Sequence, residues 1–390
     1  MMGVNKNQLL LVVVLLAIGI VGMALMNRVD VVDPPQVTPE VTPEVEVEVP
    51  KPKTFSDALD SIKEDEIKKN LYYLASDDLE GRMTGKRGHR KAEDFVKKKC
   101  EEWGLNVMFH KFTSKDIGRR ISGINPGPNR EVGDDWCNNV YAWVEGNDPE
   151  LKDEIVVVGA HLDHVGYGPS MSRGRTTEVH HGADDNASGS TALLAMAKAV
   201  SILKGKNKRT IVFQWYSAEE MGLHGSRFYC NNPKFPINSP SMTKHVAMVN
   251  LDMVGYLGKG AYFAGFHGGD SSVDISRIID GLNSKYAFAK QITSRKGGGS
   301  DHASFYNKRV PVAFLHTGLH RYYHTPDDTA DKIDYQGVEQ VSKYCFDLIW
   351  QICQSEKTPV FDHASFEEME YTHDHGHPES PFGGEEHNHN

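Results

Sequence analysis

The sequence has few cysteines, and none of them stands in a metal-finger or redox pattern. Five cysteines occur among 390 residues, with no Cys-x-x-Cys pair. This spacing excludes a zinc-finger or thioredoxin-type motif. One disulfide is possible in an oxidising compartment, and the odd count leaves at least one thiol free or in an intermolecular bond. The cysteines therefore do not define the fold.

The chain also lacks an excess of positive charge. Its formal net charge is −10, from 43 Lys and Arg against 53 Asp and Glu. This balance argues against a nucleic-acid partner. Much of the acidic excess lies near the two ends of the chain, so the net charge says little about what the central part binds. No internal repeat with a period of 20 to 50 residues is visible, so a repeat array is not expected.

Long apolar runs are absent except for one near the N-terminus. Residues 9–26 are uncharged and apolar, with Lys6 before them and Arg28 after them. This length just suffices for a membrane span. We predict that residues 1–29 form an uncleaved N-terminal membrane anchor, with a cleaved signal segment as the alternative. Either one would place the rest of the chain outside the cytoplasm, in the periplasm or at the cell surface. The domain would be membrane-anchored if the segment is kept and secreted if it is cleaved.

Composition divides the remaining chain into three segments. Residues 30–54 repeat Val-Thr-Pro-Glu and are rich in Pro and Glu, which is typical of an extended linker. Residues 55–356 carry the apolar patterning of a folded domain. Residues 357–390 are acidic and His-rich with little apolar content, so we predict a disordered tail. The role of its histidines and the oligomeric state stay open.

Apolar runs alternate with helical patterns across the central segment. Strands alternating with helices predict a single α/β domain whose mostly parallel central sheet is flanked by helices. The predicted strands are residues 139–145, 154–160, 210–217, 245–251 and 310–316, and the predicted helices include 57–76, 90–103, 188–205 and 337–354.

Side chains that bind metals follow four of these strands or precede a helix. Open α/β sheets place their sites beyond the carboxyl ends of the strands. We therefore expect these groups to meet at one edge of the sheet, together with a tyrosine that precedes the last histidine. In chain order they are His161 and Asp163, Asp184 and Asp185, Glu219 and Glu220, Asp252, and Tyr323 and His324.

Each group alone has an ordinary explanation. Asp184 and Asp185 precede a helix, where acids commonly cap the first turn. His324 stands beside Pro326 and could be a loop histidine. Five such groups at matching positions argue against coincidence. Imidazole and carboxylate without cysteine are typical of a catalytic zinc site, and the set is large enough for two zinc ions that share a carboxylate.

These motifs also carry a family resemblance. The stretches GAHLDH, GADDNASG, AEEMGLHGS, NLDMVG, SDHASF and YYHTPDDT resemble the motifs of the co-catalytic zinc aminopeptidases, metallopeptidase family twenty-eight, in the order of that family. Residues 74–88, LASDDLEGRMTGKRG, resemble the leader of bacterial, leucyl aminopeptidase-like members. The resemblance covers about residues 57–355 and implies a zinc-peptidase, phosphorylase-like fold.

The resemblance implies a ligand set for two zinc ions per chain. His161, Asp185 and Asp252 would bind one ion. Asp185 would bridge to the second ion, which Glu220 and His324 would complete.

It also implies residues that carry the chemistry. Glu219 would be the general base, Asp163 would orient the zinc-binding histidine, and Tyr323 would stabilise the oxyanion. His164 and His181 flank the motifs and are not expected to be ligands. They could form hydrogen bonds nearby, but we interpret them as surface residues.

The predicted function is a metalloaminopeptidase that hydrolyses the N-terminal peptide bond of peptides with a free N-terminus. Asp301 and His302 of SDHASF would have a supporting or substrate-side role. The alternatives are a glutaminyl cyclase-type activity, a carboxypeptidase activity on the same fold, and a non-catalytic ectodomain. The side-chain preference of the substrate cannot be inferred from the sequence.

Overall fold

The computed structural model describes residues 53–121, 133–234, 241–257, 262–265, 271–286, 290–293 and 299–363. The predicted N-terminal anchor, nearly all of the linker and most of the acidic tail lie outside these ranges. Within them, no helix is both long enough and apolar enough to cross a membrane.

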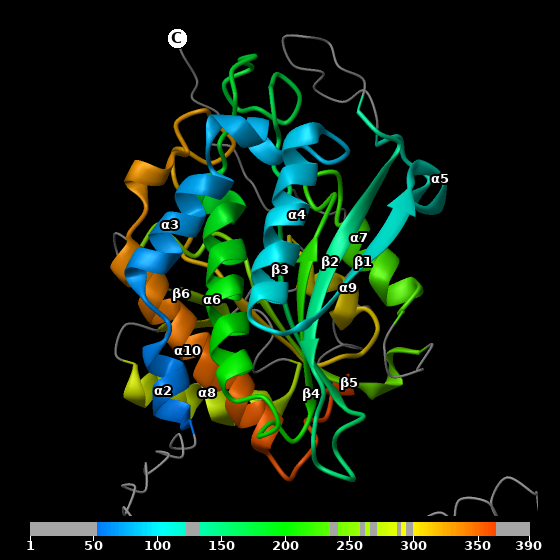
Figure 1. The fold of residues 1–390 in the computed structure, drawn as a ribbon, viewed down its shortest axis with the longest axis vertical. Coiled ribbons are helices and arrows are strands. Elements are labelled where there is room, and N and C mark those ends of the chain that lie inside the picture. Colours follow the sequence, from blue (N-terminus) through cyan, green and yellow to red (C-terminus); the bar gives the residue numbers. More distant parts are fainter. Residues whose placement is uncertain are drawn as a thin grey trace, which may run out of the picture. The chain divides into compact units, whose positions relative to one another are not determined.

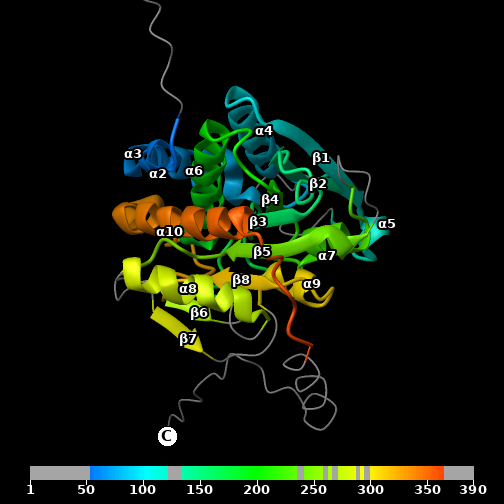
Figure 2. The same ribbon diagram turned by 90° about the horizontal axis from the view of Figure 1, so that it is seen from below.

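A six-stranded sheet forms the centre of the described domain. Figure 2 shows the strands side by side, from β1 at one edge to β8 at the other. The four strands β4, β3, β5 and β8 are parallel, whereas β1 and β2 pair antiparallel with their neighbours. In spatial order the strands are β1 (Asn106–Thr113), β2 (Trp136–Val144), β4 (Thr210–Tyr216), β3 (Ile155–His161), β5 (His245–Leu251) and β8 (Val312–Leu315).

The prediction of a mostly parallel sheet is therefore too coarse, because the sheet is mixed. The strands β3, β4 and β5 are buried at every position and read in the sequence as continuous apolar runs. The edge strand β1 was not predicted. Its first four residues are exposed or partly buried, and Lys111 separates the two buried residues His110 and Phe112, so it has no such run. A second, two-stranded parallel sheet joins β6 (Tyr262–Gly265) and β7 (Lys290–Thr293).

The helices follow the predicted pattern with one break. The helix expected over 57–76 is two helices, α2 and α3, separated at residues 61–63. Figure 1 shows α3, α6 and α10 side by side in front of the sheet. The helices are α2 (Phe55–Asp60), α3 (Glu64–Leu74), α4 (Arg87–Glu102), α5 (Ser114–Ile117), α6 (Gly189–Ile202), α7 (His224–Asn231), α8 (Val273–Lys285), α9 (His302–Tyr306) and α10 (Tyr335–Gln354).

The core lies on both faces of the sheet, because successive strand residues point to opposite sides. In β3, Val156 and Val158 pack in the cluster that includes α4, α6 and α10. Ile155 and Val157 pack in the opposite cluster with Tyr229 of α7 and Phe305 of α9.

The path of the chain places a crevice at the carboxyl end of β3. After β3 the chain crosses through α6 to β4 on one side, and after β4 it passes to β5 on the other side of β3. Connections that diverge in this way leave a binding crevice beyond the strand ends. His161 is the last residue of β3 and stands at this point.

Candidate metal centre

Two groups of imidazole and carboxylate side chains meet at the carboxyl edge of the parallel strands. Within each group the ligand atoms lie within 4.8 Å of one another. The side chains come from the end of β3 and the loop after it, from the π-helical turn η2 (Ala183–Ser188), and from the loops after β4, β5 and β8. The first group is His161, Glu219 and Asp252, and the second is His164, Asp185, Glu220 and His324.

Asp185 lies between the two groups. Its Oδ1 atom is 3.2 Å from Nε2 of His161, and its Oδ2 atom is 3.1 Å from Nε2 of His324. Nε2 of His161 also lies 3.4 Å from Oδ1 of Asp252. A carboxylate whose two oxygens face one histidine of each group has the placement that bridging two cations requires.

The donor set fits zinc. Nε2 of His324 is buried and lies 3.0 Å from Oε2 of Glu220, yet it makes no well-directed hydrogen bond among the described residues. Its other ring nitrogen, Nδ1, is fixed 2.9 Å from the carbonyl oxygen of Met171. An imidazole held on one side by a carbonyl, with its other nitrogen facing carboxylates, is arranged as zinc ligands are.

Asp163 contacts His161 through its main chain. Nδ1 of His161 lies 3.2 Å from the Asp163 carbonyl oxygen, whereas the nearer carboxylate oxygen is 3.9 Å away. That carboxylate accepts hydrogen bonds from Oγ1 of Thr84 (2.9 Å) and from the amide of Glu219 (3.1 Å). The Asp163 side chain thus fixes the loop that carries the two adjacent glutamates.

The two adjacent glutamates have opposite pKa shifts. Burial raises the pKa of Glu219 well above its ordinary value, and the charges of Glu220 and Asp252 add to that rise. Burial also acts on Glu220, but the charge of the nearby His324 and the hydrogen bond with His164 outweigh it and lower the pKa of Glu220. Glu219 is therefore the carboxyl group of the pair that takes up a proton more readily.

Tyr323 lies directly beside His324. The two rings are stacked with their centroids 3.9 Å apart, and the guanidinium carbon of Arg173 lies 4.6 Å from the tyrosine ring centroid. Burial, together with the charges of Asp185 and Glu220, raises the pKa of Tyr323 above its ordinary value. The phenol therefore keeps its proton and is available as a hydrogen-bond donor.

The interpretation of His164 as a surface residue is wrong. The side chain is fully buried, and its Nδ1 atom lies 2.9 Å from Oε1 of Glu220 and 3.7 Å from Oδ2 of Asp185. His181 is only partly buried and pairs at 2.7 Å with the exposed Asp77. The chain at Gly182 lies against the ring of His164, whereas His181 lies beside the exposed Asp77. The residue type alone does not reveal this difference in burial.

Arg82, which lies within the leader stretch of residues 74–88, was not among the residues predicted for the site. Its guanidinium is fully buried and donates to four main-chain carbonyl oxygens. These bonds join the leader to the loop after β3 and to the loop before η2. The four carbonyls belong to Leu74, Leu162, His181 and Gly182.

A second set of contacts fixes the loop that carries Asp185. The carboxylate of Asp328 accepts hydrogen bonds from the amides of Asp184 (2.9 Å) and Asp185 (3.0 Å). Asp184 turns away from both groups. Its carboxylate lies 2.9 Å from Nε2 of His320 and 2.6 Å from the amide of Gly255. The structure thus separates the two adjacent aspartates, and only Asp185 faces the metal groups.

Asp301 and His302 lie buried at the start of α9. Burial raises the pKa of Asp301 to about 7, and the charges of Asp163 and Asp252 add to the rise. The ring of His302 stacks on Phe314 of β8, with the centroids 4.3 Å apart. The histidine packs against the sheet, whereas the charge of the Asp301 carboxyl group contributes to the raised pKa of Glu219.

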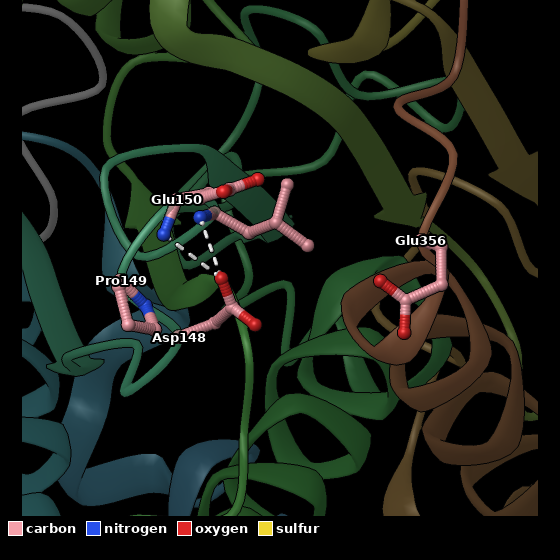
Figure 3. Close-up of a pocket in the computed structure, with 5 residues that line it drawn as sticks. Asp148, Pro149, Glu150 and Glu356 are labelled. Carbon is pink, nitrogen blue, oxygen red and sulfur yellow. Dashed lines mark hydrogen bonds between the residues drawn. The ribbon is translucent and has the colours of Figure 1, made fainter.

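A small pocket at the other end of the sheet is separate from this site. It has a volume of about 230 Å³ and is lined by the loop 148–151 and Glu356 (Figure 3). This loop precedes β3, whereas His161 ends that strand. Oδ1 of Asp148 accepts hydrogen bonds from the amides of Glu150 and Leu151. The pocket is therefore lined by a turn that carries acidic side chains.

Comparison with known proteins relates the described domain to one family. The model of peptidase family M28 matches residues 139–349, more than half of the chain. Leupeptin-inactivating enzyme 1 of Streptomyces exfoliatus is 27% identical over 331 residues, covering 80% of this chain and 65% of that protein. Probable leucine aminopeptidase 1 of Trichophyton verrucosum is 31% identical over 231 residues, covering 56% of this chain and 58% of that protein.

Solved structures show the same fold. The glutaminyl cyclase of Porphyromonas gingivalis superposes with a TM-score of 0.58 at 20% identity, covering 74% of this chain and 97% of that one. At such identity the likeness concerns the fold alone. The chain spans less than two thirds of the length of these two curated relatives. The activity must therefore be argued from the site.

Proposed function

The chain belongs to peptidase family M28, and from this premise we propose that it is a zinc-dependent exopeptidase that hydrolyses the N-terminal peptide bond of peptides. The observation that carries the proposal is the position of Asp185, whose two oxygens face His161 and His324. Relatives named as leucine aminopeptidases support the same activity.

We propose that the site holds two zinc ions. His161 and Asp252 would bind one ion, Glu220 and His324 the other, and Asp185 both. When bound, the ions would supply positive charge that favours the ionised carboxyl groups, lowers the pKa of the attacking water and polarises the scissile carbonyl.

Glu219 is the proposed general base. It takes a proton from the attacking water and returns it to the amine that leaves. Its raised pKa fits a group that must hold the proton between the two steps. The main-chain amide of Glu219 is fixed on Asp163, which limits how far the carboxyl group can move.

Tyr323 is the proposed donor to the carbonyl oxygen of the substrate. Its phenol stays protonated, and its ring is held between His324 and Arg173. A donor fixed in place before the reaction stabilises the charge that develops on that oxygen.

The location of the enzyme is proposed from the sequence alone. The apolar run of residues 9–26 lies outside the described residues, and we propose that it anchors the domain on the outer side of a membrane.

The first test is a mixed peptide library, offered with free and with acetylated N-termini to the zinc-loaded protein. Stepwise loss of N-terminal residues from the free library alone is expected, and mass spectrometry would reveal the preferred residue. Loss of ammonia from Gln-initial peptides would instead indicate a cyclase, and shortening of both libraries from the C-terminus would indicate a carboxypeptidase. No change in either library would favour a non-catalytic ectodomain.

The second test separates the base from the metal ligands. We expect Glu219→Gln to keep two zinc ions and to lose activity by about 10²- to 10⁴-fold. The matched control is Glu150→Gln in the distant pocket, which should leave both quantities unchanged. Full turnover in Glu219→Gln would remove Glu219 from the mechanism, and loss of zinc would make it a ligand.

A further inference from the structure

We propose that His164 is a fourth protein ligand of the second zinc ion, beside Asp185, Glu220 and His324. The inference rests on the proposed two-zinc function and adds a residue that the ligand set implied by the motifs does not contain. Its basis is the position of the Nδ1 atom, which lies within the group formed by the other three ligand atoms.

The distances from the two imidazole nitrogens to the two carboxylates are close to those expected around one tetrahedral ion. Zinc bonds of about 2.0–2.1 Å place the ligand atoms of a tetrahedron about 3.3 Å apart. Nδ1 of His164 lies 2.9 Å from Oε1 of Glu220 and 3.7 Å from Oδ2 of Asp185. Nε2 of His324 lies 3.0 Å from the other oxygen of Glu220, Oε2, and 3.1 Å from the same Oδ2 of Asp185. The contacts of His164 lie on either side of the tetrahedral spacing, and those of His324 lie just below it.

The ring of His164 is held in this position by its surroundings. A Cβ atom at Gly182 would lie 2.5 Å from Cγ and Cδ2 of the imidazole, so the loop passes over the ring with no room for a side chain. The main-chain amide of His164 donates to the carbonyl oxygen of Arg82 at 3.3 Å. Among the described residues Nε2 has no hydrogen-bond partner, so the polar contacts of the ring lie on the Nδ1 side.

A weaker role would be to orient Glu220 by a hydrogen bond alone. The two roles make different demands on the side chain. An asparagine can donate a hydrogen bond to Glu220 from its amide, but that nitrogen does not bind zinc as an imidazole does. His164→Asn would therefore rescue a positioning role and would not rescue a ligand.

A fourth ligand has a functional consequence. Zinc with four protein ligands is typically closed, whereas a catalytic zinc keeps a position open. The second ion would then be held firmly. The open position would lie on the ion bound by His161 and Asp252, which is the group that contains Glu219.

The experiment measures zinc in the full chain and in three variants, His164→Ala, His164→Asn and the control His180→Gln. His180 is also buried, but it bonds to Ser172 and to the carbonyl of Glu178, outside the two groups. Each protein is equilibrated with chelators of graded strength. We expect both His164 variants to bind one of the two zinc ions at least about 100-fold more weakly than the wild-type protein does. The control should bind both ions with wild-type affinity.

X-ray absorption at the zinc edge gives a second readout, independent of activity. Three imidazoles for two zinc ions are expected in wild type, and two in His164→Asn reloaded at high zinc. Wild-type affinity in His164→Asn, or two imidazoles in wild type, would overturn the proposal. A wild-type chain with one zinc ion would overturn the two-zinc function. Two imidazoles on that ion would still support His164 as a ligand, and one would overturn it.

Circular dichroism of the metal-free proteins shows whether a variant folds. If His164→Ala does not fold, His164→Asn and the imidazole count of wild type still decide the proposal.

Discussion

Replacing Arg82 by methionine should destabilise the protein even without metal. The guanidinium is fully buried and donates to carbonyl oxygens of three separate segments, among them those of Leu162 and His181. Methionine fills part of the space but donates nothing. Four buried carbonyls would lose a donor at the same time.

The expected loss follows from opposing contributions. The Gly182 carbonyl would keep the amide of Ala187 as a donor, at 3.2 Å. An unpaired buried polar group costs about 1–3 kcal/mol, so the other three carbonyls would cost about 3–9 kcal/mol. Burial of the guanidinium itself is unfavourable by several kcal/mol, and the variant avoids that cost. The same burial lowers the pKa of Arg82 to about 10. We expect the free energy of unfolding to fall by a net value of about 3–5 kcal/mol.

Urea unfolding of the metal-free proteins, followed by circular dichroism, measures this loss without the contribution of bound zinc. The control is Arg87→Met, because the Arg87 side chain is 61% exposed and pairs with Glu80 at the surface. The control should change stability by less than about 0.5 kcal/mol. A loss in Arg82→Met within about 1 kcal/mol of the control would refute the reasoning.

Two further predictions concern metal binding and pH. Asp185→Ala removes the oxygens that face both groups, so we expect the chain to lose at least one of two zinc ions on dialysis; two retained ions, measured by elemental analysis, would contradict the bridging role. Burial lowers the pKa of His245, at the start of β5, to about 4. Below about pH 6.5 the unfolded chain binds a proton there and the folded chain does not. The free energy of unfolding should therefore fall as the pH is lowered from about 6.5 to about 4. His245→Gln should reduce that fall by up to about 3 kcal/mol, and an unchanged slope in urea unfolding would argue against this assignment.

The strands at the centre of the sheet could be predicted because burial on both faces leaves a continuous apolar run. β3 and β4 are such strands. The edge strand β1 could not be predicted, since only His110 and Phe112 are buried in it and its pairing is settled by the neighbouring β2. The break between α2 and α3 could not be predicted either. It involves only residues 61–63 and leaves the apolar periodicity of the region nearly unchanged.

Candidate ligands could be predicted because strand order brings the carboxyl ends of parallel strands to one edge. His161, Asp252 and His324 follow three different strands and meet there. The burial of His164 beside Glu220 could not be predicted, because the position of its side chain depends on the path of the loop after β3. Arg82 and Asp328 act on main-chain groups of other loops, and such contacts leave no pattern of residue types.

These main-chain contacts explain how a site crowded with carboxylates can keep its shape. Ligand oxygens that are to bind cations cannot also be saturated by fixed donors of the protein. The loops must then be held at their backbones. Arg82 holds the carbonyls of Leu162 and Gly182, Asp328 holds the amide of Asp185, and the Met171 carbonyl holds the distal nitrogen of His324. The backbone is thus fixed by contacts that leave both oxygens of Asp185 directed at the two histidines.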